Sequence, residues 1–401
     1  MFRGSFVSQV IAIIGTLFLA KVYGEKAYGF FGVFISIISI VSILSTLQLD
    51  KCIITSKNKK VSINWFNFLL ILVPLISISV SILLFIISNF FFDKRLDPNI
   101  IILATIGSLT FALNLINENY FTFNKQFSTI SNARVFLTIG NVLLQVILYS
   151  HYNLYGLIIG FLISQLLLLI YYLFKNRIVI TTINFKEIKH GIKSNASIVK
   201  YLLPSNTINS LANHLMPILI LTFFGAKEAG VYFFSIKILG TPLFLISSSI
   251  SQVYFQKSSE LLKENNNKLL KLTKKIVTTN LLLMLGFLVV VNTIGMYILE
   301  YFFNENWDNL RLYTLILSIL IFARTSFNPI SNLIVVLNKN LESLIFNIYL
   351  FIINLIAIYV GYLKNDITVT IFILSIFGGI GYLLLLAYFL NHLKAITKNN
   401  V

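Results

Sequence analysis

Residues 204–260 read PSNTINSLANHLMPILILTFFGAKEAGVYFFSIKILGTPLFLISSSISQVYFQKSSE. Two apolar segments, each long enough to cross a bilayer, are joined in this stretch by the short turn GAKEAG at 225–230. The second segment carries a cation, Lys237, deep within it. A charge at that depth costs about 2.5–3.5 kcal/mol on insertion scales, so it needs a partner, a water-filled cavity or an anionic ligand. The stretch therefore predicts a helical hairpin in a membrane and one candidate binding residue.

A similar turn occurs near the start of the chain. The segment GEKAYG at 24–29 shares two glycines and a lysine with GAKEAG at a constant offset of 201 residues, about half of the 401-residue chain. This spacing indicates an internal duplication, and with an even number of spans in each half the two copies have the same orientation in the membrane. We therefore expect two lobes, 1–196 and 197–401, related by a pseudo-twofold axis along the membrane normal. Chance recurrence of a short glycine-containing turn is the alternative.

The composition identifies the class of protein. Hydrophobic residues make up 57% of the chain and charged residues 11%, whereas soluble domains have about 45–50% and 25%. The chain is therefore an integral membrane protein, and its single cysteine, Cys52, excludes an internal disulfide. No cleavable signal is visible, so the first helix is expected to remain as a signal anchor.

A window of about 19 residues predicts the membrane spans. The expected fold is all-α, with about 12 transmembrane helices in two six-helix lobes, because a lipid-exposed backbone must satisfy its own hydrogen bonds. The candidate spans lie near 5–22, 29–48, 65–91, 99–117, 135–150, 155–174, 202–224, 229–252, 276–299, 312–336, 341–362 and 368–390.

The distribution of cations predicts the orientation of these spans. Of the 31 Lys and Arg residues, 22 lie at the termini or after even-numbered spans and 7 lie after odd-numbered spans. This bias places both termini and the basic loops 50–62, 175–200 and 254–275 in the cytoplasm. The net charge of +17 is then mainly a topology signal. Solvated loops and contact with anionic membrane lipids are both compatible with the basic loops, whereas nucleic acid is not expected.

Sequence signatures of catalysis are missing. The sequence contains neither a phosphate-binding GxxxxGK[ST] loop nor a dinucleotide-binding GxGxxG motif, and its four histidines are scattered. All fourteen acidic residues fall in predicted loops or at span ends, among them Asp50, Glu118 and Glu300. We therefore expect no metal site, no cofactor and no enzymatic activity.

Four side chains are candidates for substrate binding. Lys237 lies roughly 12 Å from the outer surface, and either ligand binding or a structural ion pair would explain it. Arg324 lies in FARTSFNPISN, which is compatible with a broken helix lining a cavity or with a simple kink. His214 follows asparagines at helical spacing, which favours helix-to-helix contacts as much as substrate contacts. Lys21, at the outer end of the first span, can extend to the interface.

Three segments carry a resemblance to a known family. AKVYGEKAYGFFGVFISI at 20–37, LQLDKCI at 47–53 and FFGAKEAGVYFFSIKILGTPLFLI at 223–246, which continues into SSSISQVYFQKSSE, resemble bacterial polysaccharide exporters of the multidrug/oligosaccharidyl-lipid/polysaccharide (MOP) superfamily. The resemblance implies two six-helix lobes that open alternately to each side of the bacterial plasma membrane. It also implies an oligosaccharide carried on a polyprenyl diphosphate as the substrate.

The resemblance extends to few individual positions. Lys237 and Lys21 stand where such exporters commonly have basic residues, which implies a cationic cavity for a diphosphate. Gln48 replaces a frequent Arg, Asp50 replaces a frequent Glu, and residues 213–216 contain no acid where many members have one. Coupling to a proton or sodium gradient is therefore an open question.

The expected function is that of a flippase for lipid-linked oligosaccharide units in O-antigen or capsule synthesis. Lys237, Lys21 and Arg324 would neutralise the diphosphate, and His214 is a further candidate contact. The expected partners are the lipid-linked oligosaccharide and membrane lipids, with polysaccharide polymerase machinery as a further candidate. A multidrug or other small-molecule antiporter of the same superfamily is the alternative. A membrane glycosyltransferase or polymerase would need acidic or metal-binding residues in a sizeable external loop.

Overall fold

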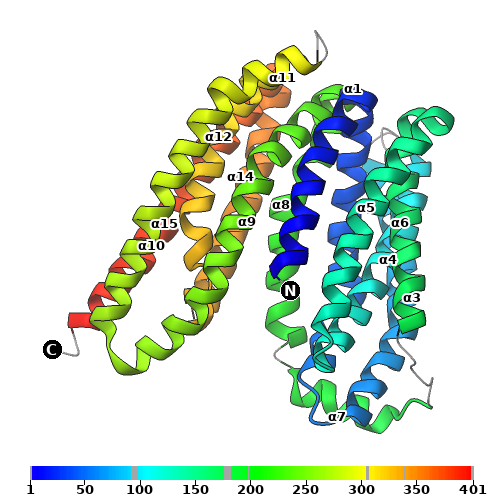
Figure 1. Cartoon of the computed structure of the whole chain (residues 1–401), viewed down its shortest axis with the longest axis vertical. Helices are drawn as coiled ribbons and strands as arrows, with labels where there is room; N and C mark the ends of the chain where they lie inside the picture. The colour runs from blue at the N-terminus through cyan, green and yellow to red at the C-terminus, as the bar shows by residue number, and fades with distance from the viewer. Residues whose placement is uncertain are drawn as a thin grey trace. The chain divides into compact units, whose positions relative to one another are not determined.

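The structure is a computed structural model that describes residues 2–91, 97–175, 182–196, 198–303, 307–337 and 339–398 (Figure 1). In this part of the chain every regular element is a helix. The expectation of an all-α fold is thereby confirmed for the described residues.

Fifteen α-helices are described. The long ones are α1 (Phe2–Thr46), α3 (Lys59–Phe91), α4 (Pro98–Phe123), α5 (Phe127–Tyr152), α6 (Gly156–Lys175), α8 (Leu203–Phe224), α9 (Ala226–Glu264), α10 (Asn266–Val290), α12 (Leu310–Phe327), α14 (Asn340–Lys364) and α15 (Ile367–Lys398). The short ones are α2 (Lys51–Ile54), α7 (Phe185–Ser194), α11 (Met296–Phe303) and α13 (Leu333–Val336).

Among the described residues, nine helical stretches are long and apolar enough to cross a membrane. Two of them contain a reversal: Ser8–Thr46 has non-helical dihedral angles at Gly24, and Phe127–Lys175 contains the junction of α5 and α6. At 1.5 Å per residue, their 39 and 49 residues reach roughly 60 and 70 Å, about twice the thickness of a bilayer core. Each stretch is therefore long enough for two crossings. The count of twelve spans stays a prediction.

The chain divides into two compact units, Met1–Gly230 and Val231–Val401. In the first unit, α1 packs against α3, α4, α5, α6 and α8. Buried amides join these helices: Gln145 on α5 donates to Leu157 O at the start of α6, and Asn114 on α4 donates to Gln165 Oε1 on α6. Such hydrogen bonds hold membrane helices together where apolar contact with lipid is equally favourable. The division at 196 that the repeat predicts stays a prediction.

In the second unit, α12 lies against α10 and α15, and α15 also packs on α14. The segment FARTSFNPISN forms a broken helix: α12 ends at Phe327 and a 3₁₀ turn follows at Asn328–Ile330. Pro329 lacks an N–H and cannot bond to the carbonyl of Thr325, four residues earlier. Asn280 Nδ2 on α10 donates to that carbonyl at 2.7 Å. A neighbouring helix thus satisfies the oxygen that the proline leaves free.

Candidate functional site

The two glycine turns of the predicted repeat have the same unusual backbone. Gly24 has φ 72° and ψ 178°, and Gly225 has φ 97° and ψ 172°. A side chain is strained at these angles, whereas glycine adopts them freely. Each glycine therefore permits a sharp reversal that most residues would resist.

The two turns also touch each other within the first unit. A Cβ atom on Gly29 would lie 2.0 Å from the carbonyl oxygen of Ala226, and one on Gly230 would lie 1.8 Å from that of Glu25. The offset of 201 relates the two contacts: Gly29 corresponds to Gly230, and Glu25 corresponds to Ala226. Reciprocal contacts of this kind are expected where two like segments meet about a local twofold axis. Only glycine permits so close an approach of the two backbones.

The ion pair between Lys227 and Glu25 breaks this symmetry. Lys227 Nζ lies 3.3 Å from Glu25 Oε1, with the two side chains 40% and 17% exposed. Under the offset of 201, Lys227 corresponds to Lys26 but Glu25 corresponds to Ala226, which carries no charge. The pair therefore has no equivalent in the other direction and adds at most about 1 kcal/mol.

In the second unit, Lys237 occupies a half-buried position on α9. Its Nζ lies 4.9 Å from the centre of the Phe233 ring, one helical turn earlier. The ring face stabilises a cation at this distance, by about 2 kcal/mol or more where water is excluded. The Phe233 ring thus holds the Lys237 ammonium beside an apolar helix, where a positive charge favours the binding of an anion.

Arg324 lies on α12, which runs alongside α9. Two hydrogen bonds indicate their register. Thr314 Oγ1 on α12 donates to Ser235 Oγ on α9 at 3.2 Å, and Asn332 Nδ2, beyond the end of α12, donates to Ser251 Oγ on α9 at 2.9 Å. In this register the backbones of Lys237 and Arg324 differ in depth by roughly 12 Å. Lys237 and Arg324 therefore lie on two neighbouring helices, with their backbones at different depths.

The other two candidates lie in the first unit. Lys21 is exposed, three residues before Gly24, and His214 is half-buried on α8, eleven residues before Gly225. Because the two turns meet, these positions differ in depth by roughly 12 Å along the packed helices. The structure therefore does not bring Lys21 and His214 together. A single cationic cavity formed by all four candidates stays a prediction.

One buried carboxylate was not predicted from the sequence. Asp50, expected in a solvated cytoplasmic loop, is only 4% exposed. Its Oδ2 accepts a hydrogen bond from Asn119 Nδ2 at 2.8 Å, while Oδ1 has no hydrogen-bond partner among the described residues. Burial raises the pKa of the Asp50 carboxyl and lowers that of the adjacent Lys51. Asparagines on α4, such as Asn114 and Asn117, were the available signal, because amides on a membrane helix often face polar groups inside the protein.

The chain leaves its helical path just before Asp50. Leu47 and Gln48 have positive φ angles of 48° and 58°, which are unfavourable for residues with a Cβ atom. Gln48 is buried, and its Oε1 accepts a hydrogen bond from Asn206 Nδ2 on α8 at 2.8 Å. The unwound segment thus connects the end of α1 to α8 next to the buried carboxylate.

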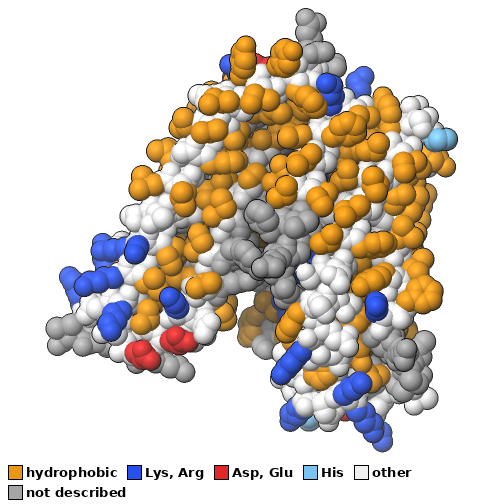
Figure 2. All heavy atoms as spheres, viewed as in Figure 1, with side chains coloured by type: hydrophobic (Ala, Val, Ile, Leu, Met, Phe, Trp, Pro, Cys, Tyr) orange, Lys and Arg blue, Asp and Glu red, His pale blue; other side chains and the backbone are white. Residues whose placement is uncertain are grey.

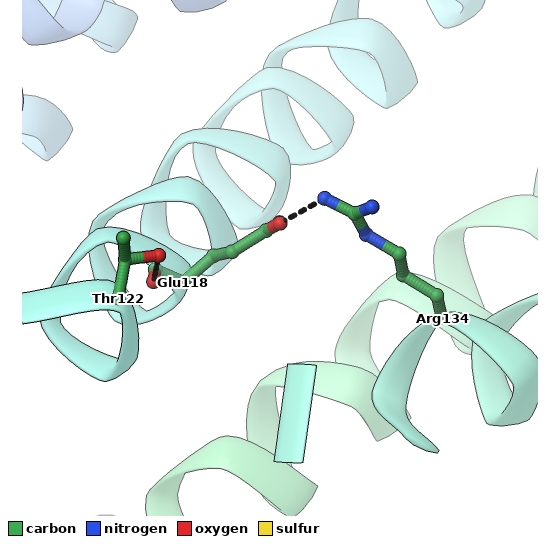
Figure 3. A network of polar contacts seen from close by, with 3 residues as sticks. All are labelled: Glu118, Thr122 and Arg134. Carbon is green, nitrogen blue, oxygen red and sulfur yellow. Dashed lines mark hydrogen bonds and ion pairs between the residues drawn. The ribbon is translucent and has the colours of Figure 1, made fainter. Parts of the chain in front are cut away.

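Two other charges pair with each other. Glu118 on α4 points toward Arg134 on α5 and forms an ion pair with it, while Thr122 Oγ1 donates to the Glu118 carbonyl at 2.8 Å (Figure 3). The two charged side chains are 28% and 46% exposed, so the pair contributes at most about 1 kcal/mol. Arg134, predicted in a loop, therefore lies on a helix and links α4 to α5.

Within the described residues, no group of three or more His, Cys, Asp or Glu side chains could hold a metal ion.

Comparisons with known proteins identify the fold. The structure superposes on an inward-facing multidrug resistance MATE family transporter of the MOP superfamily with a TM-score of 0.73, 13% identity, and 98% of this chain and 96% of that chain covered. It superposes on the lipid II flippase MurJ in an inward closed conformation with a TM-score of 0.72, 16% identity, and 99% and 89% covered. A MOP superfamily transporter from Pyrococcus furiosus gives a TM-score of 0.58 at 13% identity, with 98% and 94% covered. At these identities the likeness establishes the fold alone.

One family profile matches the sequence. The profile of a family described as "Polysaccharide biosynthesis protein" matches residues 18–311. No curated protein sequence matches the chain. The proteins of the superposed structures are described as transporters and a flippase rather than as enzymes, in agreement with the expectation from the sequence.

Proposed function

Because the chain belongs to the polysaccharide biosynthesis protein family, we propose that it is a flippase that moves a polyprenyl-diphosphate-linked oligosaccharide across the bacterial plasma membrane. The substrate would be a repeat unit for a surface polysaccharide, such as O-antigen or capsule. Support comes from the fold shared with the lipid II flippase MurJ and from the ammonium of Lys237, held at membrane depth over the Phe233 ring.

The proposed mechanism uses the charges of this chain. The diphosphate enters laterally while its prenyl tail remains in lipid, and Lys237 neutralises part of its charge because an ammonium in an apolar setting strongly favours an anion. Arg324 acts from the neighbouring helix α12, and Lys21 and His214 are contacts for other parts of the substrate. Alternate opening of two lobes, 1–196 and 197–401, to the two sides of the membrane would complete the transfer.

The alternative is a multidrug or other small-molecule antiporter with cationic substrates, and one of the superposed structures is that of a multidrug resistance MATE family transporter. Its substrates would meet positive groups at Lys237 and Arg324, which disfavours it electrostatically. The positive charge at Lys237 and Arg324 therefore favours an anionic substrate over a cationic one.

Deletion of the gene followed by mass spectrometry of lipid-linked sugars tests the proposal. We expect diphosphate-linked oligosaccharide to accumulate on the inner face and surface polysaccharide to disappear, with both restored by the wild-type chain. Unchanged lipid-linked sugars together with greater sensitivity to cationic drugs would replace the flippase with the antiporter.

A further inference from the structure

The basic segment between α6 and α8 contains a helix, α7, fixed to the start of α3. Its N-cap, Asn184, accepts a hydrogen bond from the backbone N–H of Glu187. Asn64 on α3 accepts from Asn184 N at 2.9 Å, and its Nδ2 donates to Asn184 O at 3.2 Å and to Glu187 Oε2 at 2.7 Å. The first turn of α7 and its single acidic side chain are therefore held against α3.

The apolar side of α7 is used by the same contact. Ile188 is buried in a cluster with Trp65, and Ile192 packs against that cluster. A Cβ atom on Gly191 would lie 2.6 Å from Trp65 Cζ2, so the absence of a side chain there lets α7 approach the indole. The orientation of the helix is thereby fixed, and its opposite side faces outward.

Three lysines occupy that outward side. Lys186, Lys189 and Lys193 are all exposed, and their spacing of three and four residues places them on one face. None of the three forms an ion pair with a described residue. Like charges at this spacing repel each other and destabilise a helix. An anionic partner would remove that repulsion.

Other cations surround this face. Lys57, Lys59 and Lys60 are exposed just before Asn64, and Lys200 is exposed with its Nζ 5.4 Å from the centre of the Tyr201 ring. Figure 2 shows Lys and Arg side chains at the end of the first unit where Figure 1 places α7. The positive face of α7 is therefore part of a larger basic surface.

The level of α7 along α3 indicates which partner it meets. A candidate membrane span begins at Lys59, and α7 is attached at residues 64 and 65, roughly 8 Å further along. This is the depth of lipid headgroups beside a spanning helix. Two large aromatic side chains, Phe185 and Tyr201, are 65% and 64% exposed there, and such residues favour the membrane interface.

We infer that the exposed face of α7, formed by Lys186, Lys189 and Lys193, binds the headgroups of anionic phospholipids. Clusters of four to eight cations directly beside a membrane helix have this role in general, with about a fivefold gain in binding for each lysine. The lipid holds α7 on α3 more firmly, because it neutralises a charge repulsion that the protein leaves unbalanced. The inference does not depend on the transported substrate.

Hydrogen exchange of the intact protein in nanodiscs tests the inference. Nanodiscs of phosphatidylglycerol mixed with phosphatidylcholine are compared with nanodiscs of phosphatidylcholine alone. We expect the amides of 185–194 to exchange several-fold more slowly with phosphatidylglycerol present, and high salt to abolish the difference. Equal exchange in the two lipid mixtures would overturn the inference and leave an acidic protein as the remaining candidate partner.

Three variants locate the effect. Lys186→Gln/Lys189→Gln/Lys193→Gln should lose the slowing, whereas Lys186→Arg/Lys189→Arg/Lys193→Arg should keep it. The matched control is Lys268→Gln/Lys271→Gln/Lys275→Gln, which removes the same charge at the same spacing from exposed positions on α10 and should leave the slowing at α7 intact. Persistence of the slowing in the first variant, or its loss in the Arg variant or in the α10 control, contradicts a site on α7. The Arg variant keeps the test valid if the Gln variant disturbs the helix.

Discussion

At the scale of single residues, Lys237 separates a binding role from a structural one. Lys237→Met should keep normal abundance while flipping falls about tenfold or more, because a charge-assisted contact is worth about 1.5–3 kcal/mol. Lys237→Arg should keep part of the activity, since the charge remains but the shape of the donor changes. Abundance and lipid-linked sugar are measured together, with Lys364→Met, exposed at the end of α14, as the control. If Lys237 is instead part of a structural ion pair, Lys237→Met should destabilise the protein by roughly 3–5 kcal/mol and lower its abundance.

Asp50 gives a second prediction at this scale, on pH. Its pKa is raised by burial, so the folded state favours the protonated form. The protonated Asp50 carboxyl therefore stabilises the folded state fully below its unfolded pKa of about 3.9. This stabilisation is lost as the pH rises through the higher folded pKa. Asp50→Asn should remove this loss and be at least as stable as wild type at neutral pH. Thermal unfolding in detergent between pH 4 and 8 measures the effect, with the exposed Glu264→Gln as control. Equal pH dependence of Asp50→Asn and wild type would contradict it.

At the scale of elements, the contact of the two turns depends on glycine. Gly230→Ala should destabilise the protein by about 1–3 kcal/mol, because its Cβ would overlap the Glu25 carbonyl, a backbone atom that cannot rotate away. Gly29→Ala should do the same through Ala226. Gly286→Ala on α10 is the matched control, since its Cβ would enter open space and alanine favours a helix. Unfolding temperatures in detergent compare the three, and a wild-type value for Gly230→Ala would refute the close contact.

The broken helix of the second unit is also an element with a measurable cost. Asn280→Ala should destabilise the protein by about 1–3 kcal/mol, since it leaves the Thr325 carbonyl unsatisfied. In a Pro329→Ala background the cost should shrink, because residue 329 then has an N–H that can reach this carbonyl. A double-mutant cycle of unfolding free energies measures the coupling. Strictly additive effects would show that Asn280 does not compensate for the proline.

At the scale of the whole molecule, the asymmetry of 22 cations against 7 predicts the topology. Single cysteines at Asn184 and Glu264 should react only from the cytoplasm, and one at His151 only from outside, since each position is exposed and lies beside the end of a long helix. Labelling of intact cells with a membrane-impermeant thiol reagent in a Cys52→Ser background measures this. External labelling at Glu264 would overturn the twelve-span arrangement.

The sequence by itself determined the class of this protein, because the hydrophobicity of each segment decides whether it enters the bilayer and the distribution of cations decides its orientation. It also located the glycine turns, whose repeated spacing is visible without coordinates. Contacts between distant segments depended on tertiary structure: the meeting of Gly29 with Ala226, the burial of Asp50 beside Asn119, and the bond from Asn280 to the Thr325 carbonyl. No local pattern encodes these contacts, because a polar side chain next to a membrane span can face water or a partner helix, and packing decides between them.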